Sequence, residues 1–369
     1  MVELYVELGE RRYPIHMTAE LPGRLLVCEV ARLRPAPAPI LIVTDDNVGA
    51  LYADGVCQAL KAAGYQPHCL TLAHGEASKT LNVVSKVLDE ALSLGLSRQD
   101  LIVALGGGVV GDIAGFSASV LLRGVRYIQV PTTLLAQVDS AVGGKTGVNH
   151  KMGKNLIGAF WQPSAVISSQ AVLSTLPDRE RRCGLAEAIK HGILGDASLV
   201  TWCEQHAQAL RTLEPEAVAH LVERCCTIKG QVVSDDERES GRRAVLNLGH
   251  TFGHAYERLM GYGTLTHGEA VALGMVWSAR LSERLGVAEP GLERVLVDIF
   301  ESLGLPNDTQ GQGLPSLSSL MEAARNDKKA DQTHVTFILI EEVGRTLFKR
   351  LPWTHIEEAL SGLPSRRTP

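Results

Sequence analysis

The chain has 369 residues, of which 45% are hydrophobic and 21% charged, and its formal net charge is −5. This apolar fraction excludes a disordered or fibrous protein, and the length predicts more than one domain because single cores rarely grow beyond about 250–300 residues. The sequence has no basic excess for nucleic-acid phosphates, no apolar run long enough to cross a membrane and no secretory signal at its start, so we expect neither nucleic acid nor membrane as a partner.

The first part of the chain alternates strand and helix patterns. Residues 2–8 and 11–17 predict a β-hairpin about Gly9-Glu10. Short apolar runs predict strands at 40–43 and 101–105, and we expect further strands at 68–72 and 127–130. A helix-like stretch ends near Gly64, and residues 81–94 have helical periodicity. Strands that alternate with helices predict a mostly parallel sheet, which binds ligands at its carboxyl edge.

Helical patterns dominate after residue 165. They lie at 178–193, 196–212, 215–235, 243–260, 267–285 and 289–303. One late strand, at 334–340, is the exception. We therefore predict an α/β domain over residues 1–164 and, apart from that strand, an all-α domain over residues 165–369. Their boundary should fall in the loop-rich segment 145–175, and we expect a ligand cleft between them.

A glycine-rich turn follows the predicted strand at 101–105. Residues 106–111 match the GxGxxG pattern, in which the missing side chains let backbone approach a pyrophosphate at a helix N-terminus. The usual acid about 20 residues later is absent, and Asp45 with Asn47 is the expected ribose partner, which favours NAD over NADP. A tight turn of an ordinary α/β protein explains the motif alone equally well, but Asp112 and the pair Thr132-Thr133 favour the cofactor.

Histidines and a carboxylate in the second half form a candidate metal site. His250 and His254 are spaced i, i+4 and share a helical face, and no glutamate follows His250, which excludes the zinc-protease motif HExxH. His267 begins a second cluster, and Glu187 precedes Lys190 by three residues. One carboxylate with two imidazoles suits Zn²⁺ or a similar divalent ion that keeps positions open for a substrate. Spacing alone does not separate this interpretation from that of core histidines.

Polar and cationic residues crowd the same segments. They are Lys145, Lys154, Asn155, Lys190, Lys229, Arg243 and Asn247. Each alone is unremarkable because lysine and arginine usually lie in solvent. Several cations that converge near a metal would instead bind a small polyanion with phosphate and carboxylate groups.

Six segments resemble, in the same order along the chain, those of the 3-dehydroquinate synthase family, and the resemblance extends over nearly the whole chain. They are GGGVVGD (106–112), VPTTLLAQVDSAVGGKTGVN (130–149), GKNLIGAFWQP (153–163), GLAEAIKHG (184–192), LNLGHTFGHA (246–255) and HGEAVALGM (267–275). The resemblance implies the dehydroquinate synthase fold, with an N-terminal NAD-binding α/β domain and a C-terminal helical domain. It also implies a homodimer.

The family's metal and cofactor positions carry over residue by residue. Its metal ligands correspond to Glu187, His250 and His267, which implies zinc or cobalt. Its NAD contacts correspond to Asp45, Asn47, Glu76, Lys79, Gly107, Gly108, Asp112, Thr132, Thr133, Asp139, Ser140, Lys145, Lys154, Thr175 and Leu176.

The family's catalytic and substrate positions carry over in the same way. The catalytic positions correspond to Lys145, Lys190, Lys229, Arg243, Asn247 and His254. The further substrate contacts correspond to Arg123, Asp139, Lys154, Asn155 and Lys328, with Lys329 as the alternative to the last. Arg123 resembles the arginine that one subunit lends to the substrate phosphate of its partner. The chain departs from the family at residues 150–153, HKMG, where the family has His-Pro-x-Gly, and this departure touches no ligand.

The resemblance also implies a reaction of the shikimate pathway, which leads to the aromatic amino acids. The substrate is 3-deoxy-D-arabino-heptulosonate 7-phosphate, and the products are 3-dehydroquinate and phosphate. NAD⁺ takes a hydride from C5, phosphate leaves by elimination, the same hydride returns, and an intramolecular aldol reaction closes the ring. Lys145, Lys190, Lys229 and Arg243 would hold phosphate and carboxylate, and His254 would carry a proton or anchor a hydroxyl.

Two enzymatic alternatives remain beside this interpretation. One is another sugar phosphate cyclase with a substrate that lacks a carboxylate; Arg243 and Asn247 argue against it because a guanidinium and a carboxamide suit a carboxylate. The other is a metal-dependent polyol dehydrogenase, which would release NADH with its product.

Seven cysteines, an odd number without a CxxC pair, indicate reduced thiols, and we expect a cytoplasmic protein.

Overall fold

The computed structural model describes residues 2–261, 263–307, 313–327 and 333–361. The chain forms two compact units, which we call the first unit (Met1–Leu176 and Val218–Arg238) and the second unit (Pro177–Ala217 and Glu239–Pro369). This division differs from the expected boundary after residue 164. The strand β9 (Ala165–Ser169) follows that position and pairs in parallel with strands of the first unit. The helix α9 (Pro215–Asp235) begins in the second unit and continues in the first.

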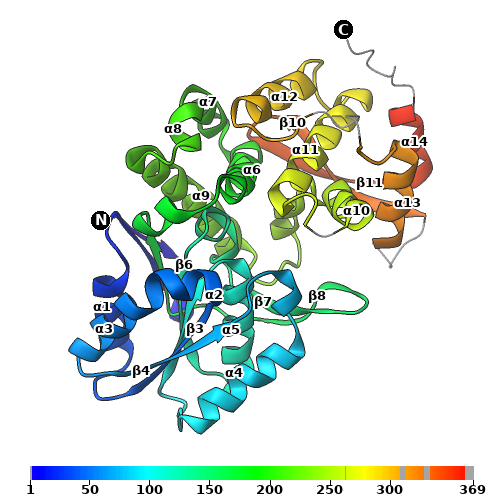
Figure 1. Cartoon of the computed structure of the whole chain (residues 1–369). Coiled ribbons are helices and arrows are strands. Elements are labelled where there is room, and N and C mark those ends of the chain that lie inside the picture. The colour runs from blue at the N-terminus through cyan, green and yellow to red at the C-terminus, as the bar shows by residue number, and fades with distance from the viewer. Residues whose placement is uncertain (1, 262, 308–312, 328–332, 362–369) are drawn as a thin grey trace. The chain divides into compact units, whose positions relative to one another are not determined.

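A seven-stranded sheet forms the centre of the first unit (Figure 1). Its order is β1-β2-β9-β6-β5-β3-β4. The remaining strands are β1 (Val2–Val6), β2 (Tyr13–Thr18), β3 (Pro39–Asp45), β4 (Gln66–Leu72), β5 (Leu101–Gly106) and β6 (Arg126–Pro131). β1 and β2 form an antiparallel hairpin, and the other pairings are parallel, which confirms the predicted hairpin and parallel sheet.

Helices cover both faces of this sheet. The helices α1 (Gly23–Leu33) and α3 (Asp54–Ala62) share one core cluster with Ile40 and Ile42 of β3. The helices α4 (Leu81–Ser93) and α5 (Gly108–Val120) share another with Leu41 and Val43. Successive side chains of a strand point to opposite faces, so the two clusters together need an apolar residue at every position from Ile40 to Val43. This is why the strands read as continuous apolar runs in the sequence.

A two-stranded arm occupies part of the segment that we expected to be rich in loops. Its strands are β7 (Lys145–His150) and β8 (Gly153–Phe160), which pair antiparallel. Gly147 and Gly158 face each other in the register. A Cβ on Gly158 would lie 2.1 Å from the carbonyl oxygen of Thr146, so the close approach of these strands requires glycine. The glycines that look like loop residues in the sequence are therefore strand residues here.

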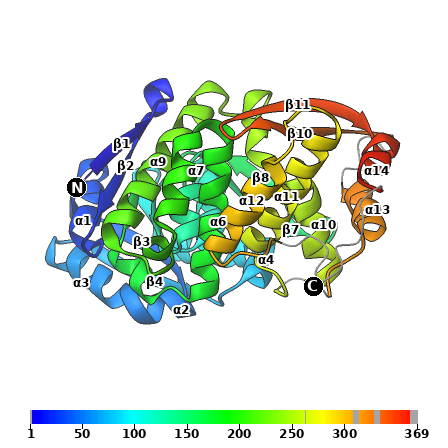
Figure 2. The same ribbon diagram turned by 90° about the horizontal axis from the view of Figure 1, so that it is seen from above.

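The second unit is mostly helical, as predicted. Its helices are α6 (Asp178–Gly195), α7 (Ala197–Gln205), α8 (Ala207–Arg211), α10 (His250–Met260), α11 (His267–Arg284), α12 (Leu292–Ser302), α13 (Leu317–Asp327) and α14 (Trp353–Ser361). The late strand β10 (His334–Glu342) is present and pairs antiparallel with β11 (Arg345–Pro352), which the sequence analysis did not predict. In Figure 2 this ribbon lies along the helices of the unit, and its apolar residues join the core around α11.

Short helical turns connect these elements. They are η1 (Gly9–Arg11), α2 (Asp46–Val48), η2 (Gly49–Ala53), η3 (Glu76–Ser78), η4 (Leu121–Arg123), η5 (Ala136–Ser140), η6 (Ala171–Thr175) and η7 (Arg242–Asn247). All seven cysteines are free thiols. No helix in the described part of the chain combines the length and the apolarity that crossing a bilayer would need.

Candidate functional site

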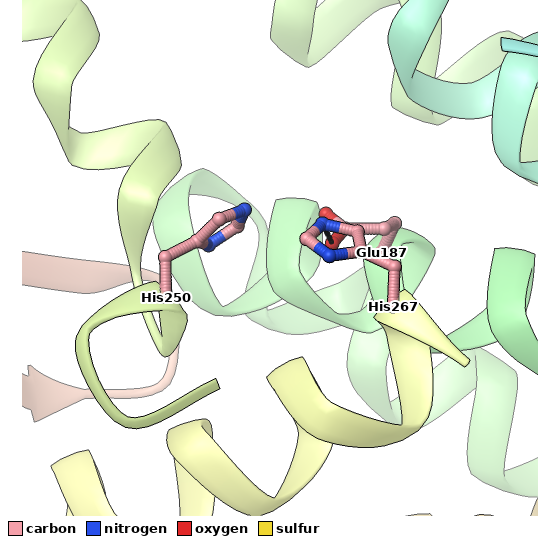
Figure 3. A group of neighbouring side chains, drawn as sticks. All are labelled: Glu187, His250 and His267. Atoms are coloured by element: carbon pink, nitrogen blue, oxygen red, sulfur yellow. Dashed lines mark ion pairs between the residues drawn. The ribbon is translucent and has the colours of Figure 1, made fainter. Parts of the chain in front are cut away.

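Three side chains of the second unit converge from three helices (Figure 3). Glu187 comes from the middle of α6, and His250 and His267 are the first residues of α10 and α11. One ligand atom from each lies within 4.8 Å of the others. The structure thus brings together the three residues that the sequence analysis assigned as metal ligands.

Local sequence explains why both histidines stand at helix starts. The predicted helix 243–260 is broken at Gly249, which has a left-handed φ of 78° and separates η7 from α10. α11 begins with a capping box, in which Thr266 accepts a hydrogen bond from the backbone of Glu269 and Glu269 accepts one from the backbone of Thr266. These two devices place His250 and His267 in the first turns of their helices.

Hydrogen bonds leave the same ring nitrogen of each histidine for a metal. Nδ1 of His250 lies 3.0 Å from the carbonyl oxygen of Leu248, to which it can donate a proton. Nδ1 of His267 lies 3.4 Å from Oε2 of Glu257, and its Nε2 lies 3.6 Å from Oε1 of Glu187. A metal-binding histidine usually donates through its other nitrogen to a carbonyl or carboxylate in this way, which fixes the tautomer and the ring orientation.

The electrostatics of the cluster also suit a cation. Glu187 is fully buried, and neither of its oxygens accepts a hydrogen bond from the described residues, although Lys190 forms an ion pair with it. Burial and the charge of Lys190 hold the pKa of His250 well below its usual value, so its imidazole is neutral, as a metal ligand must be. Burial opposes a proton on His267, but Glu257 and Glu187 outweigh it and raise its pKa. The donor set fits a zinc-like divalent ion.

Other predicted residues of the second unit lie on the same elements. His254 is one turn beyond His250, with its ring centroid 5.3 Å from that of His250 and 6.2 Å from that of His267. Arg243 is buried on η7, which contacts α6. Asn247 ends η7 and donates a hydrogen bond to Glu239 at 2.9 Å. The predicted contact Lys328 and its alternative Lys329 lie outside the described residues.

The glycine-rich turn of the first unit joins β5 to α5, as predicted. A Cβ on Gly107 would meet Thr133 at 3.0 Å, and a Cβ on Gly108 would meet the hydroxyl of Ser140 at 3.0 Å. The structure therefore brings together four of the residues assigned to NAD. Gly107 is the N-cap of α5, so the free N–H groups of this helix begin directly at the turn.

Further predicted NAD residues lie at strand ends of the same sheet. Asp45 ends β3, and one of its oxygens accepts the N–H of Val48 at 2.9 Å, so it caps α2, which contains Asn47. The hydroxyls of Thr132 and Ser140 are buried and have no partner among the described residues. Such hydroxyls at the carboxyl edge of a parallel sheet are available to a ligand. Thr175 ends η6, where it bonds the Tyr52 hydroxyl at 2.7 Å, and Leu176 follows.

A buried lysine connects the turn to the β7–β8 arm. Nζ of Lys79 lies 2.5 Å from Oδ2 of Asp112 in α5 and 2.5 Å from Oδ1 of Asn155 in β8. Asn155 has a left-handed φ of 53°, a conformation that asparagine adopts more readily than most residues other than glycine. Asn149 accepts the N–H of Asn155 at 2.9 Å and donates to Glu76 at 2.7 Å. Sequence reasoning missed Asn149, although it ends the segment 130–149.

The remaining predicted residues of the first unit divide into an ion pair and exposed cations. Lys229 on α9 donates to the backbone carbonyl of Asp139 at 2.6 Å and pairs with its carboxylate. Lys145 opens β7 and is exposed, and Lys154 is half-buried on β8. Arg123 is exposed in η4, where Leu122 and Arg123 both adopt positive φ values, 50° and 67°. Two such residues in succession mark a strained turn of the kind found at functional positions.

Sequence reasoning also missed two acids of the second unit. Glu257 is buried and contacts His267, and it follows His254 by three residues on the same helical face. The spacing of His250, His254 and Glu257 could have revealed it, since i, i+4 and i+7 share a face. Glu239, the partner of Asn247, precedes η7 and has no such signal.

Two family models match the chain in succession. The model described as 3-dehydroquinate synthase N-terminal matches residues 69–183, and the model described as 3-dehydroquinate synthase C-terminal matches residues 184–330. Together they include the glycine-rich turn and all three residues of the metal triad.

Solved structures match the chain over nearly its whole length. A 2-deoxy-scyllo-inosose synthase in complex with carbaglucose-6-phosphate, NAD⁺ and Co²⁺ is 26% identical, with a TM-score of 0.88 over 98% of this chain and 100% of that one. The 2-epi-5-epi-valiolone synthase from Streptomyces hygroscopicus subsp. jinggangensis 5008, with NAD⁺ and Zn²⁺ bound, is 27% identical, with a TM-score of 0.84 over 98% of each chain. A glycerol dehydrogenase from Schizosaccharomyces pombe shares the fold at 17% identity and a TM-score of 0.66, over 94% of this chain and 87% of that one.

Proposed function

The chain belongs to the superfamily of dehydroquinate synthases and sugar phosphate cyclases, and we propose that it converts 3-deoxy-D-arabino-heptulosonate 7-phosphate to 3-dehydroquinate and phosphate. We further propose that it uses NAD⁺ and a zinc or cobalt ion. Both cyclases described above contain NAD⁺ with Co²⁺ or Zn²⁺. The ligand set Glu187, His250 and His267 and the turn at Gly107 offer this chain the corresponding chemistry.

The choice of an acidic substrate rests on Arg243. Its side chain is only 1% exposed, on a short 3₁₀ helix that ends at Asn247, three residues before the metal ligand His250. A guanidinium is always charged and matches a carboxylate through two parallel hydrogen bonds, and a carboxamide can donate a third. A substrate without a carboxylate would offer these donors no matching acceptor, which lowers the affinity for that substrate.

The residues of the first unit supply the cofactor and phosphate contacts in this proposal. The free N–H groups of α5 beyond Gly107 would face the pyrophosphate, and the second oxygen of Asp45 would accept from a ribose hydroxyl. Lys145 and Lys154 would contact both cofactor and substrate, and Lys229 would be held for the substrate by Asp139. We also propose a homodimeric, cytoplasmic protein in which Arg123 reaches the substrate phosphate of the partner subunit.

The residues of the second unit would orient the substrate and move protons. When bound, NAD⁺ supplies a transient hydride acceptor and the metal supplies a Lewis acid for the substrate hydroxyls. Lys190 and Arg243 would stabilise the anionic groups of one substrate through successive steps. His254 lies next to both histidine ligands, where it can exchange a proton with a hydroxyl or hold it by a hydrogen bond.

The second candidate is a cyclase of sugar phosphates that lack a carboxylate. It is favoured by the similarity to the 2-deoxy-scyllo-inosose and 2-epi-5-epi-valiolone synthases, which match over nearly the whole chain. The alternative of a polyol dehydrogenase has weaker support, since the glycerol dehydrogenase match shows the fold alone.

A phosphate-release assay separates these candidates. The protein, loaded with NAD⁺ and Zn²⁺ or Co²⁺, is given the keto-acid phosphate, sedoheptulose 7-phosphate or glucose 6-phosphate, each with and without chelator. We expect phosphate from the keto-acid phosphate alone, loss of the reaction with chelator, and no net rise in NADH absorbance. Turnover of sedoheptulose 7-phosphate without the keto-acid phosphate would refute the proposal, and NADH formed with each product would indicate a dehydrogenase.

Variants of two adjacent arginines test the acidic substrate directly. Arg243→Gln removes the buried guanidinium, and Arg242→Gln removes the exposed one beside it. We expect the first variant to lose about 100-fold in kcat/KM for the keto-acid phosphate, because a charged hydrogen-bonded contact contributes up to about 3 kcal/mol. The second should keep its activity. Equal activity of the two variants would contradict the assignment of Arg243.

A further inference from the structure

One side of α6 packs against the start of α11. Arg179, Cys183 and Glu187 are spaced four residues apart and therefore lie in a row along one side of α6. Glu187 faces His267 at 3.6 Å, and Sγ of Cys183 accepts the N–H of Gly268 at 3.2 Å. A Cβ on Gly268 would lie 2.2 Å from the carbonyl oxygen of Cys183, so the two helices approach closely at this point. The row ends at Arg179.

Arg179 holds the loop that leads into α11. Its guanidinium donates to the carbonyl of Gly263 at 3.0 Å and to the carbonyl of Thr264, and it also bonds Oε2 of Glu269 at 3.1 Å. The same Oε2 accepts the N–H of Thr266 at 2.7 Å in the capping box. One arginine therefore contacts both the loop before His267 and the acid that caps its helix.

We propose that Arg179 is a positioning residue of the metal centre: it sets the position of His267 relative to Glu187. This inference rests on the proposed metal site. Glu187 and Arg179 belong to the same helix, whereas His267 is the first residue of another helix, and first turns fray unless they are capped. The loop and cap contacts of Arg179 restrain that turn against the helix that provides the third ligand. Arg179 is not a member of the metal triad; it contacts Gly263, Thr264 and Glu269, and in this proposal it acts through His267.

The contacts of Arg179 with the loop do not depend on the loop's side chains. Arg179 bonds backbone carbonyls, which every residue offers, and the cap belongs to Thr266 and Glu269, which adjoin His267. The hydroxyl of Thr264 fastens the loop to the carbonyl of Met260 at 2.8 Å, so the loop is braced at the end of α10 as well. The loop that Arg179 contacts is therefore bonded to the end of α10 as well as to the start of α11.

Metal affinity of the apo-protein tests this proposal without substrate or turnover. Zn²⁺ and Co²⁺ dissociation constants are measured by competition with a chelator for the wild type, Arg179→Gln and Arg182→Gln. Arg182 is a matched control, since it lies one turn along on α6 and pairs with Asp178. We expect about 10-fold weaker metal binding in Arg179→Gln and an altered visible absorption of bound Co²⁺, because partners that orient ligands contribute about 10–100-fold to affinity. Arg182→Gln should bind as the wild type does.

Glu269→Gln separates the loop contact from the cap. Glutamine also serves in a capping box, so this variant keeps the bond to Thr266 and weakens only the partnership with Arg179. Its loss of affinity should be smaller than that of Arg179→Gln and should not add to it in the double variant, because the two residues act as one unit.

The outcomes distinguish three cases. Weaker metal binding in Arg179→Gln, with an apo-protein melting temperature close to that of Arg182→Gln, supports the proposal. A lower melting temperature with unchanged metal affinity assigns Arg179 a purely structural role and overturns it. A wild-type protein that binds no divalent metal would overturn the proposed function, and this inference with it.

Discussion

Gly274 of α11 lies against the backbone that precedes the metal ligand His250. A Cβ at position 274 would lie 1.9 Å from the carbonyl oxygen of Gly249 and 3.0 Å from the backbone nitrogen of Gly253. Both are backbone atoms of α10 or its cap, so no side-chain rotation can relieve the clash. Gly274→Ala must therefore separate the two helices, and Gly249 moves together with its neighbour His250.

The structure gives the size of this effect. Real Cβ contacts essentially never fall below 3.0 Å, so the helices must part by about 1 Å at Gly249. Overpacking of this kind costs about 1–3 kcal/mol, and the backbone contact favours the upper end, partly offset by the roughly 1 kcal/mol that alanine gains over glycine inside a helix. We expect the melting temperature to fall by roughly 5 °C and metal affinity to fall by at least about 10-fold, because a ligand displaced by 1 Å leaves the coordination geometry.

Gly55→Ala is the matched control. Gly55 lies inside α3, and a Cβ there would meet nothing within 4 Å. The same substitution should stabilise the protein by up to about 1 kcal/mol and leave metal binding unchanged. The assay combines thermal unfolding of the apo-proteins with metal competition. A Gly274→Ala variant that matches the wild type in both measurements would refute the reasoning from close helix contact.

Three further predictions concern single side chains. Asp100 is buried, which would raise its pKa, but hydrogen bonds from Ser97 and the guanidinium of Arg34 hold the pKa below its usual range. Asp100→Asn should therefore lower the free energy of unfolding by about 1–3 kcal/mol at pH 7. The unfolded carboxyl protonates first as pH falls, so this deficit should shrink below about pH 4 in urea titrations; a constant deficit would contradict the ion pair. His250→Ala should remove bound metal and activity while circular dichroism stays unchanged, and full activity without metal would refute the ligand set. Arg123→Ala should raise KM for the sugar phosphate at least about 10-fold, and an unchanged KM would argue against a shared site.

Elements of the fold could be predicted where their own residues have a distinct pattern of apolar positions. β3 and β5 read as strands because both faces of the sheet are covered, which demands continuous apolar runs. β9 is equally buried but only five residues long, and it follows a segment of glycines and polar residues, so it read as a loop. β11 is largely exposed and rich in basic residues, and it pairs with β10 in a two-stranded sheet, so its sequence lacks the apolar alternation of a half-buried strand.

The candidate metal site shows a similar limit. The spacing of His250 and His254 predicts a shared helical face, and the structure confirms this. Spacing cannot reveal that Gly249 turns the chain just before His250, or that Glu187 of another helix approaches His267. The assignment of the three ligands therefore came from the resemblance to a family, and the structure supplied the physical reason for it.

The partners of the buried lysines are the part of the site that could least be predicted from the sequence. Lys79, Lys190 and Lys229 are buried lysines, and each is paired with an acid that lies between three and 90 residues away along the chain. An unpaired buried ammonium would cost several kcal/mol, so these lysines can be preorganised for anionic ligands only if the fold also provides a counter-ion. Of these three pairs, Glu187 and Lys190 on α6 can be recognised from the sequence, because they are three residues apart on one helix. Two of the cations that the sequence analysis singled out, Lys190 and Lys229, are therefore members of ion pairs in the folded protein, and their acids fix where these two charges lie.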